Sequence, residues 1–190
     1  MFDPSNVNKL IRSRRSVFPK MYNGKPIEKS IIKEILENAN VAPTHRLTEP
    51  WRFKVITGDS LILLGEILGA KYRQAAGDRY SEKKYEKTVM KPTQSACVIA
   101  ICMQRDLEER IPEWEEIAAV GCAVQNMWLS CTAYGIGSYW SSPKTIAEMG
   151  DFLQLADEEH CLGFFYMGYC DIEIPASPRT AIEEKTTWIS

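Results

Sequence analysis

The stretch GCAVQNMWLSCTAYGIGSYW, residues 121–140, changes from a helical pattern to a strand pattern near its second glycine. With the residues just before it, it predicts a long helix over 115–134, whose apolar face comprises Ile117, Val120, Val124, Met127, Cys131 and Tyr134. The other faces of this helix are also small or apolar, since they carry Ala119, Gly121, Ala123, Trp128, Ser130 and Ala133. A helix that is apolar nearly all round is buried on several sides, as at a domain centre or a subunit interface.

Hydrophobic patterning on either side of this stretch predicts an α+β or α/β domain with about four core strands. Apolar or alternating segments predict strands at 51–57, 96–103, 136–140 and 161–169. Helical spacing predicts helices at 6–12, 28–38, 61–68 and 144–155, and an exposed, basic helical stretch at 71–91. The polar tail, 171–190, ends in TTWIS, which indicates a segment that docks on another surface, such as a partner subunit.

Length and composition indicate one intracellular globular domain over residues 1–190. The chain is 45% hydrophobic, and its 23 Lys and Arg against 25 Asp and Glu give a net charge of −2. This balance argues against a dedicated nucleic-acid binder, which carries a basic face. The sequence shows neither a membrane span nor a signal peptide, so we expect a soluble, cytoplasmic protein.

The small net charge conceals an uneven distribution along the chain. Residues 1–40 hold 8 Lys and Arg against 4 Asp and Glu, and residues 71–91 hold 7 against 3. Residues 148–190 are acidic, with 2 against 9. We therefore expect a local anion site rather than a broad basic surface.

The six cysteines are expected to be inert, reduced thiols in the core. They lie in or beside apolar runs: Cys97, Cys102, Cys122, Cys131, Cys161 and Cys170. Buried free cysteine behaves as a small hydrophobic residue in a reducing compartment. Because no CxxC motif occurs and the chain has 2 histidines, we expect no metal site.

Two segments could bind a phosphate. RSRRS, residues 12–16, offers three guanidinium groups and two hydroxyls beside a short helix, and these groups suit a phosphate. Arg179, in the acidic tail, is a second candidate ligand. A solvated basic turn is the plain alternative for both.

Two further segments could contact a planar ligand. GIGSYWSSP, residues 135–143, combines a strand end with glycines and hydroxyls, although a tight connection explains it equally well. APTHRLTEPW, residues 42–51, presents His45 on a stiff loop, where it could also be an ordinary surface histidine. Neither GxGxxG, GxxxxGK[ST] nor GxSxG occurs, and no Ser-His-Asp triad can be assembled.

Taken in order, these segments resemble the FMN-dependent nitroreductase family. The likeness spans nearly the whole chain and rests on IRSRRSV, APxxxxxxPWRF, GCAVQNMWLSCTAYGIGSYW, and GY followed by a tail with Pro-Arg. PEWEE, APTH and GFFYMGY are most similar to the short members of that family. The resemblance implies a central, mostly antiparallel sheet flanked by helices and a long buried central helix. It also implies a domain-swapped type of homodimer with a C-terminal extension and two FMN sites in the interface.

The resemblance also implies roles for individual residues. Arg14, Arg15 and Ser16 match the motif that holds the phosphate or ribityl end and the N1–O2 edge of the flavin, and Arg179 matches the tail arginine that completes the phosphate site. The backbone of the loop at Trp140, Ser141 and Ser142 would face the isoalloxazine. His45 and Glu49 would reach the flavin from the other subunit.

Three positions depart from the family pattern. Leu47 stands where many members carry asparagine, and Glu49 where they carry glutamine. A carboxylate at position 49 removes an amide donor and adds a negative charge near the flavin. Phe18 stands where a basic residue often follows the motif.

The resemblance implies an FMN-dependent NAD(P)H oxidoreductase with ping-pong kinetics. NADH or NADPH would give a hydride to FMN, and a nitroaromatic, quinone or similar acceptor would then take the electrons. No protein side chain would act as a nucleophile. The alternatives are a flavin-binding or sequestering protein without turnover, another reduced-flavin reaction such as dehalogenation or ene reduction, and a phosphate-binding module without flavin.

Overall fold

The four apolar segments pair into one sheet in the computed structural model, which describes residues 3–189. The strands are β1 (Trp51–Ile56), β2 (Cys97–Gln104), β3 (Ile136–Ser141) and β4 (Glu159–Tyr169), and their order in the sheet is β1-β2-β4-β3. All three pairings are antiparallel, which confirms the expected sheet. The two central strands are buried on both faces, and this explains why their sequences are almost continuously apolar.

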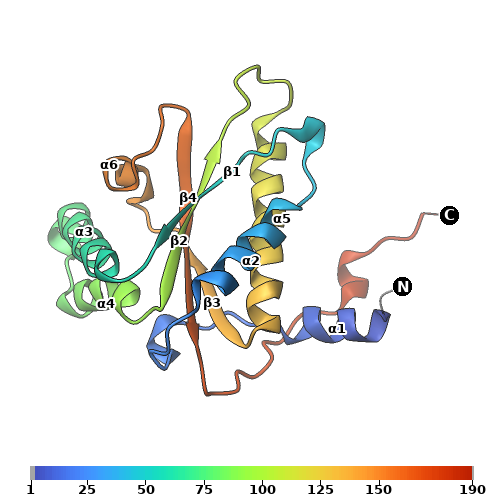
Figure 1. The fold of residues 1–190 in the computed structure, drawn as a ribbon, viewed down its shortest axis with the longest axis horizontal. Coiled ribbons are helices and arrows are strands. Elements are labelled where there is room, and N and C mark those ends of the chain that lie inside the picture. Colours follow the sequence, from blue (N-terminus) through green and yellow to red (C-terminus); the bar gives the residue numbers. More distant parts are fainter. Residues whose placement is uncertain (1–2, 190) are drawn as a thin grey trace.

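Helices cover both faces of the sheet (Figure 1). On one face α2 (Lys29–Asn40) and α5 (Glu113–Ala133) enclose a core with Ile99, Ile101 and Phe165. On the other face α3 (Asp59–Ala76) and the short α6 (Gly150–Leu153) enclose a second core with Val98 and Tyr166. The α+β prediction is therefore confirmed.

Helix α4 (Glu82–Thr93) packs closely along α3. Gly69 of α3 makes this possible, because a Cβ there would lie 2.5 Å from Cγ2 of Val89 and 2.9 Å from Cε2 of Tyr85. A side chain at Gly65 would meet the carbonyl of Val89. The two glycines thus allow α4 to pack closely against α3, beside the β3 end of the sheet.

The long helix α5 has 21 residues, two residues longer at its start than predicted and one shorter at its end. Val120, Val124 and Met127 face the sheet and are buried, as the periodicity predicts. Ile117 on the outer face of α5 is 44% exposed in one chain, so burial of this side at a subunit interface stays a prediction.

Three other segments differ from the sequence-based expectations. The helix expected at 61–68 runs from Asp59 to Ala76, and the stretch 71–91 is divided at Gly77, whose φ of 48° ends α3. The helix expected at 144–155 is a 3-10 turn (Ile146–Met149) followed by α6, which ends at the left-handed Gln154. All six cysteines are free, as expected, but two are not core thiols: Cys122 is exposed on α5, and Cys170 is only partly buried.

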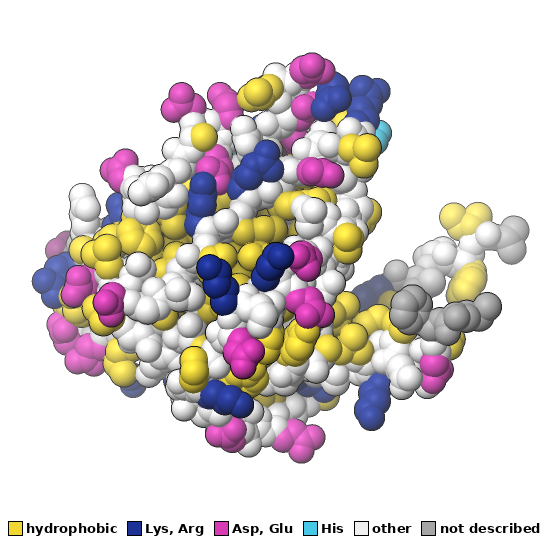
Figure 2. All heavy atoms as spheres, in the orientation of Figure 1, with side chains coloured by type: hydrophobic (Ala, Val, Ile, Leu, Met, Phe, Trp, Pro, Cys, Tyr) yellow, Lys and Arg dark blue, Asp and Glu magenta, His cyan; other side chains and the backbone are white. Residues whose placement is uncertain are grey.

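Both terminal segments lie away from the sheet (Figure 1). Helix α1 (Pro4–Ser13) has no buried residue, and the described part of the tail is almost wholly exposed, including 91% of Trp188. Figure 2 shows these segments projecting from the body of the molecule. Among the described residues, no helix has the length and apolar character needed to cross a membrane.

Candidate functional site

The basic motif Arg14–Ser16 lies beside β3, at the edge of the sheet. Helix α1 ends at Ser13, and Ser16 then forms a parallel bridge with Ser138 of β3. The amide of Val17 donates to the carbonyl of Ser138 over 2.9 Å. Gly137 permits this approach, because a Cβ there would lie 2.9 Å from Cβ of Val17.

Three arginines bring positive charge to this edge. The Arg14 guanidinium carbon lies 4.6 Å from the ring centroid of Trp128, which belongs to the second half of α5. Trp128 also donates from Nε1 to the carbonyl of Arg15 over 3.2 Å. Burial, followed by the charges of Arg15 and Arg179, lowers the pKa of the Arg14 guanidinium. The charges of Arg15 and Arg179 therefore act on Arg14, and an anion here would offset this repulsion.

Several buried polar atoms along this edge have no hydrogen-bond partner within residues 3–189. They include Nη1 of Arg14 and Nε of Arg15, and also Oγ of Ser138 and Nε1 of Trp140 on β3. All four atoms can donate hydrogen bonds. Since an unpaired buried polar group costs about 1–3 kcal/mol, this set indicates a place for a ligand that accepts hydrogen bonds.

The segment at the end of β3 lies near a cavity. The indole of Trp140 packs on the backbone of Gly163 in β4, where a side chain would collide with it. The hydroxyl of Ser142 donates to the carbonyl of Leu162 over 2.9 Å, so this group is already engaged. Ser141 and Ser142 line a cavity of about 460 Å³ that extends to α3 and α4.

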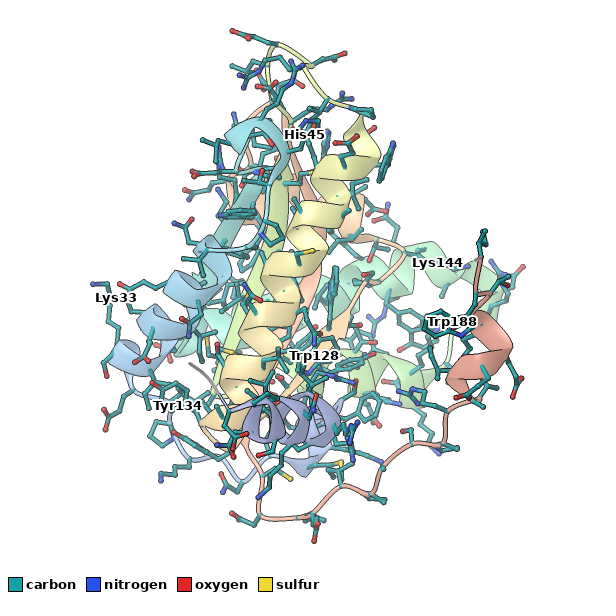
Figure 3. All side chains as sticks on the ribbon, turned by 90° about the vertical axis from the view of Figure 1, so that its right-hand side faces the viewer. Lys33, His45, Trp128, Tyr134, Lys144 and Trp188 are labelled. Carbon is teal, nitrogen blue, oxygen red and sulfur yellow. The ribbon has the colours of Figure 1, made fainter. Side chains whose placement is uncertain are left out.

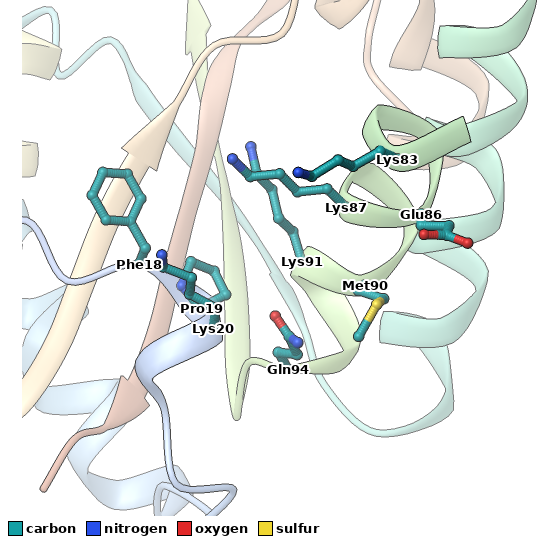
Figure 4. Close-up of a pocket in the computed structure, with 9 residues that line it drawn as sticks. All are labelled: Phe18, Pro19, Lys20, Lys83, Glu86, Lys87, Met90, Lys91 and Gln94. Carbon is teal, nitrogen blue, oxygen red and sulfur yellow. The ribbon is translucent and has the colours of Figure 1, made fainter. Parts of the chain in front are cut away.

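A second cavity of about 460 Å³ lies between α4 and the residues that follow the basic motif (Figure 4). Its lining residues are Phe18, Pro19, Lys20, Lys83, Glu86, Lys87, Met90, Lys91 and Gln94. Lys91 lines both cavities. The stretch 71–91 was expected only to be exposed and basic, although the four-residue spacing of Lys83, Lys87 and Lys91 places them on one helix face.

His45 and Glu49 lie at the other end of α5. Nδ1 of His45 is 2.6 Å from Oε2 of Glu115, in the first turn of α5, whereas Trp128 lies near its end (Figure 3). The thirteen residue steps from Glu115 to Trp128 span roughly 20 Å of helix. Within one chain, His45 and Glu49 therefore do not share a ligand with the arginines, and their contact with the other subunit's flavin stays a prediction.

The loop that carries these two residues is strained. Arg46, Leu47 and Glu49 have φ values of 52°, 55° and 43°. Residues other than glycine adopt this left-handed conformation at a cost, and such residues gather at functional sites. Leu47 is 79% exposed, so no packing within the chain explains its conformation.

The fold and the site together define an α+β protein with a cationic candidate site at one sheet edge. The family model described as "Nitroreductase family" matches residues 11–169. The chain belongs to this family of oxidoreductases.

Three related proteins illustrate the similarity. "Putative NAD(P)H nitroreductase YfhC" of Bacillus subtilis (strain 168) is 30% identical over 94% of this chain and 91% of its own length. A nitroreductase-like family protein from Bacillus cereus has a TM-score of 0.82 and 25% identity, covering 100% of this chain and 98% of its own. A nitroreductase from Desulfovibrio desulfuricans, solved in complex with FMN, has a TM-score of 0.73 and 25% identity, covering 97% of this chain and 96% of its own.

Proposed function

We propose that this chain is an FMN-dependent NAD(P)H oxidoreductase that reduces nitroaromatics, quinones or similar acceptors. The observation that carries the proposal is the positive charge of Arg14, Arg15 and Arg179 at this edge, together with buried donors that find no partner among residues 3–189. FMN has a phosphate and a ring rich in hydrogen-bond acceptors, and both suit such a set of donors. The D. desulfuricans relative, solved with FMN, supports the choice of cofactor.

The side chains have distinct roles in this proposal. Arg14, Arg15, Ser16 and Arg179 hold the phosphate or ribityl end and the N1–O2 edge, where guanidinium charge favours negative charge on the ring. The backbone at 140–142 faces the ring plane. The chemistry that FMN supplies is the transfer of electrons from NADH or NADPH to the acceptor, in two successive steps at one site.

The active form in this proposal is a homodimer. The outer face of α5 exposes 68% of Trp114 and 44% of Ile117, and the tail exposes 91% of Trp188 and 97% of Ile189. Apolar surface of this kind marks a protein interface. A partner that covers α5 would also bring its own His45 and Glu49 toward the arginines. We therefore assign residues 1–190 to one domain, with 171–190 as a tail that packs on the partner.

A reducing compartment fits this assignment. The six cysteines are free, including Cys102 and Cys161, which lie opposite each other on β2 and β4. Free thiols persist where glutathione keeps them reduced, and we therefore propose a cytoplasmic location.

FMN retention tests the proposal. The purified protein should absorb near 450 nm, and the double variant Arg14→Ala, Arg179→Ala should lose the flavin on a desalting column. The control Arg73→Ala, Arg110→Ala removes the same charge from arginines that lie elsewhere, and it should keep the flavin. Full retention of FMN by the first variant would contradict the assignment.

Turnover distinguishes an enzyme from a flavin carrier. An enzyme oxidises NADH or NADPH when an acceptor such as a nitroaromatic or a quinone is present, and its double-reciprocal plots are parallel if the kinetics are ping-pong. A yellow protein that oxidises neither nicotinamide would be a carrier. A protein that stays colourless after incubation with FMN would be a phosphate-binding module.

A further inference from the structure

Helix α4 presents a row of three lysines on one face. Lys83, Lys87 and Lys91 recur at intervals of four residues, so their side chains project from successive turns. In Figure 4 their ammonium groups extend in the same direction, toward the strand side of the cavity. We call these three residues the lysine row.

The lysine row has no neutralising partner within residues 3–189. None of the ion pairs in that range involves Lys83, Lys87 or Lys91. Glu86 lines the same cavity, but its carboxylate points away from the row in Figure 4. Burial, followed by the charges of Lys87 and Lys84, lowers the pKa of the Lys91 ammonium. Like charges at this spacing destabilise a helix, so an anion between them would be stabilising.

The lysine row is separate from the arginine cluster. Arg14 lies on Trp128 of α5, on one side of the sheet, whereas α4 lies with α3 on the other (Figure 1). Both groups nevertheless lie beside β3: Nζ of Lys91 is 5.7 Å from the ring centroid of Tyr139, which lies one residue before Trp140. A molecule bound at the row would therefore lie next to the proposed flavin loop.

Apolar side chains complete the cavity. Phe18 and Met90 are 44% and 49% exposed, and the ring of Phe18 lies 4.6 Å from that of Tyr139. A cavity with an aromatic wall on one side and ammonium groups on the other matches a molecule that has an aromatic ring and an acidic group. Lysine ammonium groups act as point charges, so they can bind either a carboxylate or a phosphate.

We propose that the lysine row binds the acidic group of an aromatic substrate that reacts at this site. This inference rests on the proposed function, because the substrate exchanges electrons with FMN. The acidic group can belong to the electron acceptor, as in an aromatic carboxylate, or be the 2′-phosphate of NADPH. In either case its charge is neutralised by Lys87 and Lys91.

The test compares paired probes on the flavin-loaded protein. The variant Lys87→Gln, Lys91→Gln is compared with Lys29→Gln, Lys33→Gln, which removes two lysines at the same spacing from α2, on the other face of the sheet. FMN retention is measured first in each. The readout without turnover is the change in flavin absorbance during titration with benzoate or with benzamide. The kinetic readouts are the ratio of kcat/KM for 4-nitrobenzoate to that for nitrobenzene, and the ratio for NADPH to NADH.

We expect the α4 variant to retain FMN and to bind benzoate at least tenfold more weakly. Its ratio of kcat/KM for 4-nitrobenzoate to kcat/KM for nitrobenzene should fall at least tenfold. A loss confined to the NADPH ratio would assign the acidic group to the dinucleotide. If FMN stays bound and neither ratio changes, the inference is wrong while the proposed function stands. Loss of FMN from the α4 variant would mean that the lysines bind the flavin itself, and it would also overturn the inference. A wild-type protein that binds no FMN would contradict the proposed function itself, and this inference with it.

Discussion

The guanidinium carbon of Arg14 lies 4.6 Å from the ring centroid of Trp128, so a residue of the N-terminal motif rests on the central helix. The same indole donates to the carbonyl of Arg15 over 3.2 Å and meets the ring of Phe165 edge-on at 5.6 Å. Trp128 thus connects the sheet core to both arginines. A side chain that looks like one more apolar position in α5 therefore positions the cationic site.

Replacing Trp128 should weaken the binding of FMN, because Trp128 positions both Arg14 and Arg15. In Trp128→Leu the π face is lost, and a cation–π contact of this kind contributes about 0.5–2 kcal/mol, so we expect the Kd for FMN to rise between about twofold and thirtyfold. Fluorescence titration of the flavin-free protein with FMN measures this. Trp128→Phe keeps an aromatic face and loses the indole donor, and it should fall between Trp128→Leu and wild type. Equal Kd values for all three proteins would mean that the contact between Arg14 and the ring of Trp128 does not contribute to FMN binding.

The elements that the sequence predicted well are those decided by local periodicity. Both central strands and α5 are within two residues of their predicted bounds. Strands buried on both faces appear as continuous apolar runs, and the sheet-facing side of a helix appears as apolar residues at intervals of three and four. The helix predicted over 144–155 was wrong because its first part, Ile146–Met149, is a 3-10 turn and the left-handed Gln154 ends α6. The outer face of α5 is exposed in one chain, because sequence shows that its residues are small or apolar but not whether they face their own chain or a partner.

The candidate site was predicted in part. The order of the motifs pointed to Arg14, Arg15 and Arg179; the charges of Arg15 and Arg179 act on Arg14 in the structure, and their role toward FMN stays a prediction. The lysine row was missed because its significance depends on how α3 and α4 pack, which is set by Gly65 and Gly69 rather than by α4 itself. Charge counts showed the excess of lysine, but they did not show that three ammonium groups face one cavity.

Gly163 should be intolerant of a side chain. It has a φ of 151°, and a Cβ there would collide with Trp140 Nε1 and lie 2.8 Å from the carbonyl oxygen of Ser141. We expect Gly163→Ala to lower the free energy of unfolding by about 1–3 kcal/mol, as overpacking does, and to weaken FMN binding by displacing Trp140. Urea unfolding measures the first effect. Gly150→Ala is the control, since no atom lies within 4 Å of its added Cβ, and a wild-type-like Gly163→Ala would show that the Trp140 contact relaxes freely.

A charge on the outer face of α5 should disrupt the proposed homodimer. Ile117 is 44% exposed there, and Ile117→Arg would place a guanidinium in an apolar interface. We expect a change from dimer to monomer by size-exclusion chromatography with light scattering. Ile62→Arg is the matched control, because Ile62 is 53% exposed on α3 at the other face of the sheet. If Ile117→Arg remains as dimeric as Ile62→Arg, this side of α5 is not the interface.

Buried thiols should make the protein less stable at alkaline pH. Burial raises the pKa of Cys97 and of Cys131 from an ordinary 9.0 to about 12. Between these two values the unfolded chain releases thiol protons that the folded chain keeps. The free energy of unfolding therefore falls as pH rises from about 9 toward 12, by at most about 1.4 kcal/mol per pH unit for each thiol.

The double variant Cys97→Ala, Cys131→Ala isolates this contribution. Urea unfolding at pH 8, 9 and 10 should show a shallower fall in stability above pH 9 than in wild type, because tyrosines and lysines titrate in both proteins and their effects cancel in the comparison. Cys122→Ala is the control, since it removes a thiol that is exposed on α5 rather than buried in the core. The same slope in all three proteins would mean that the two core thiols ionise in the folded state as readily as in the unfolded chain, against their burial between α5 and the sheet.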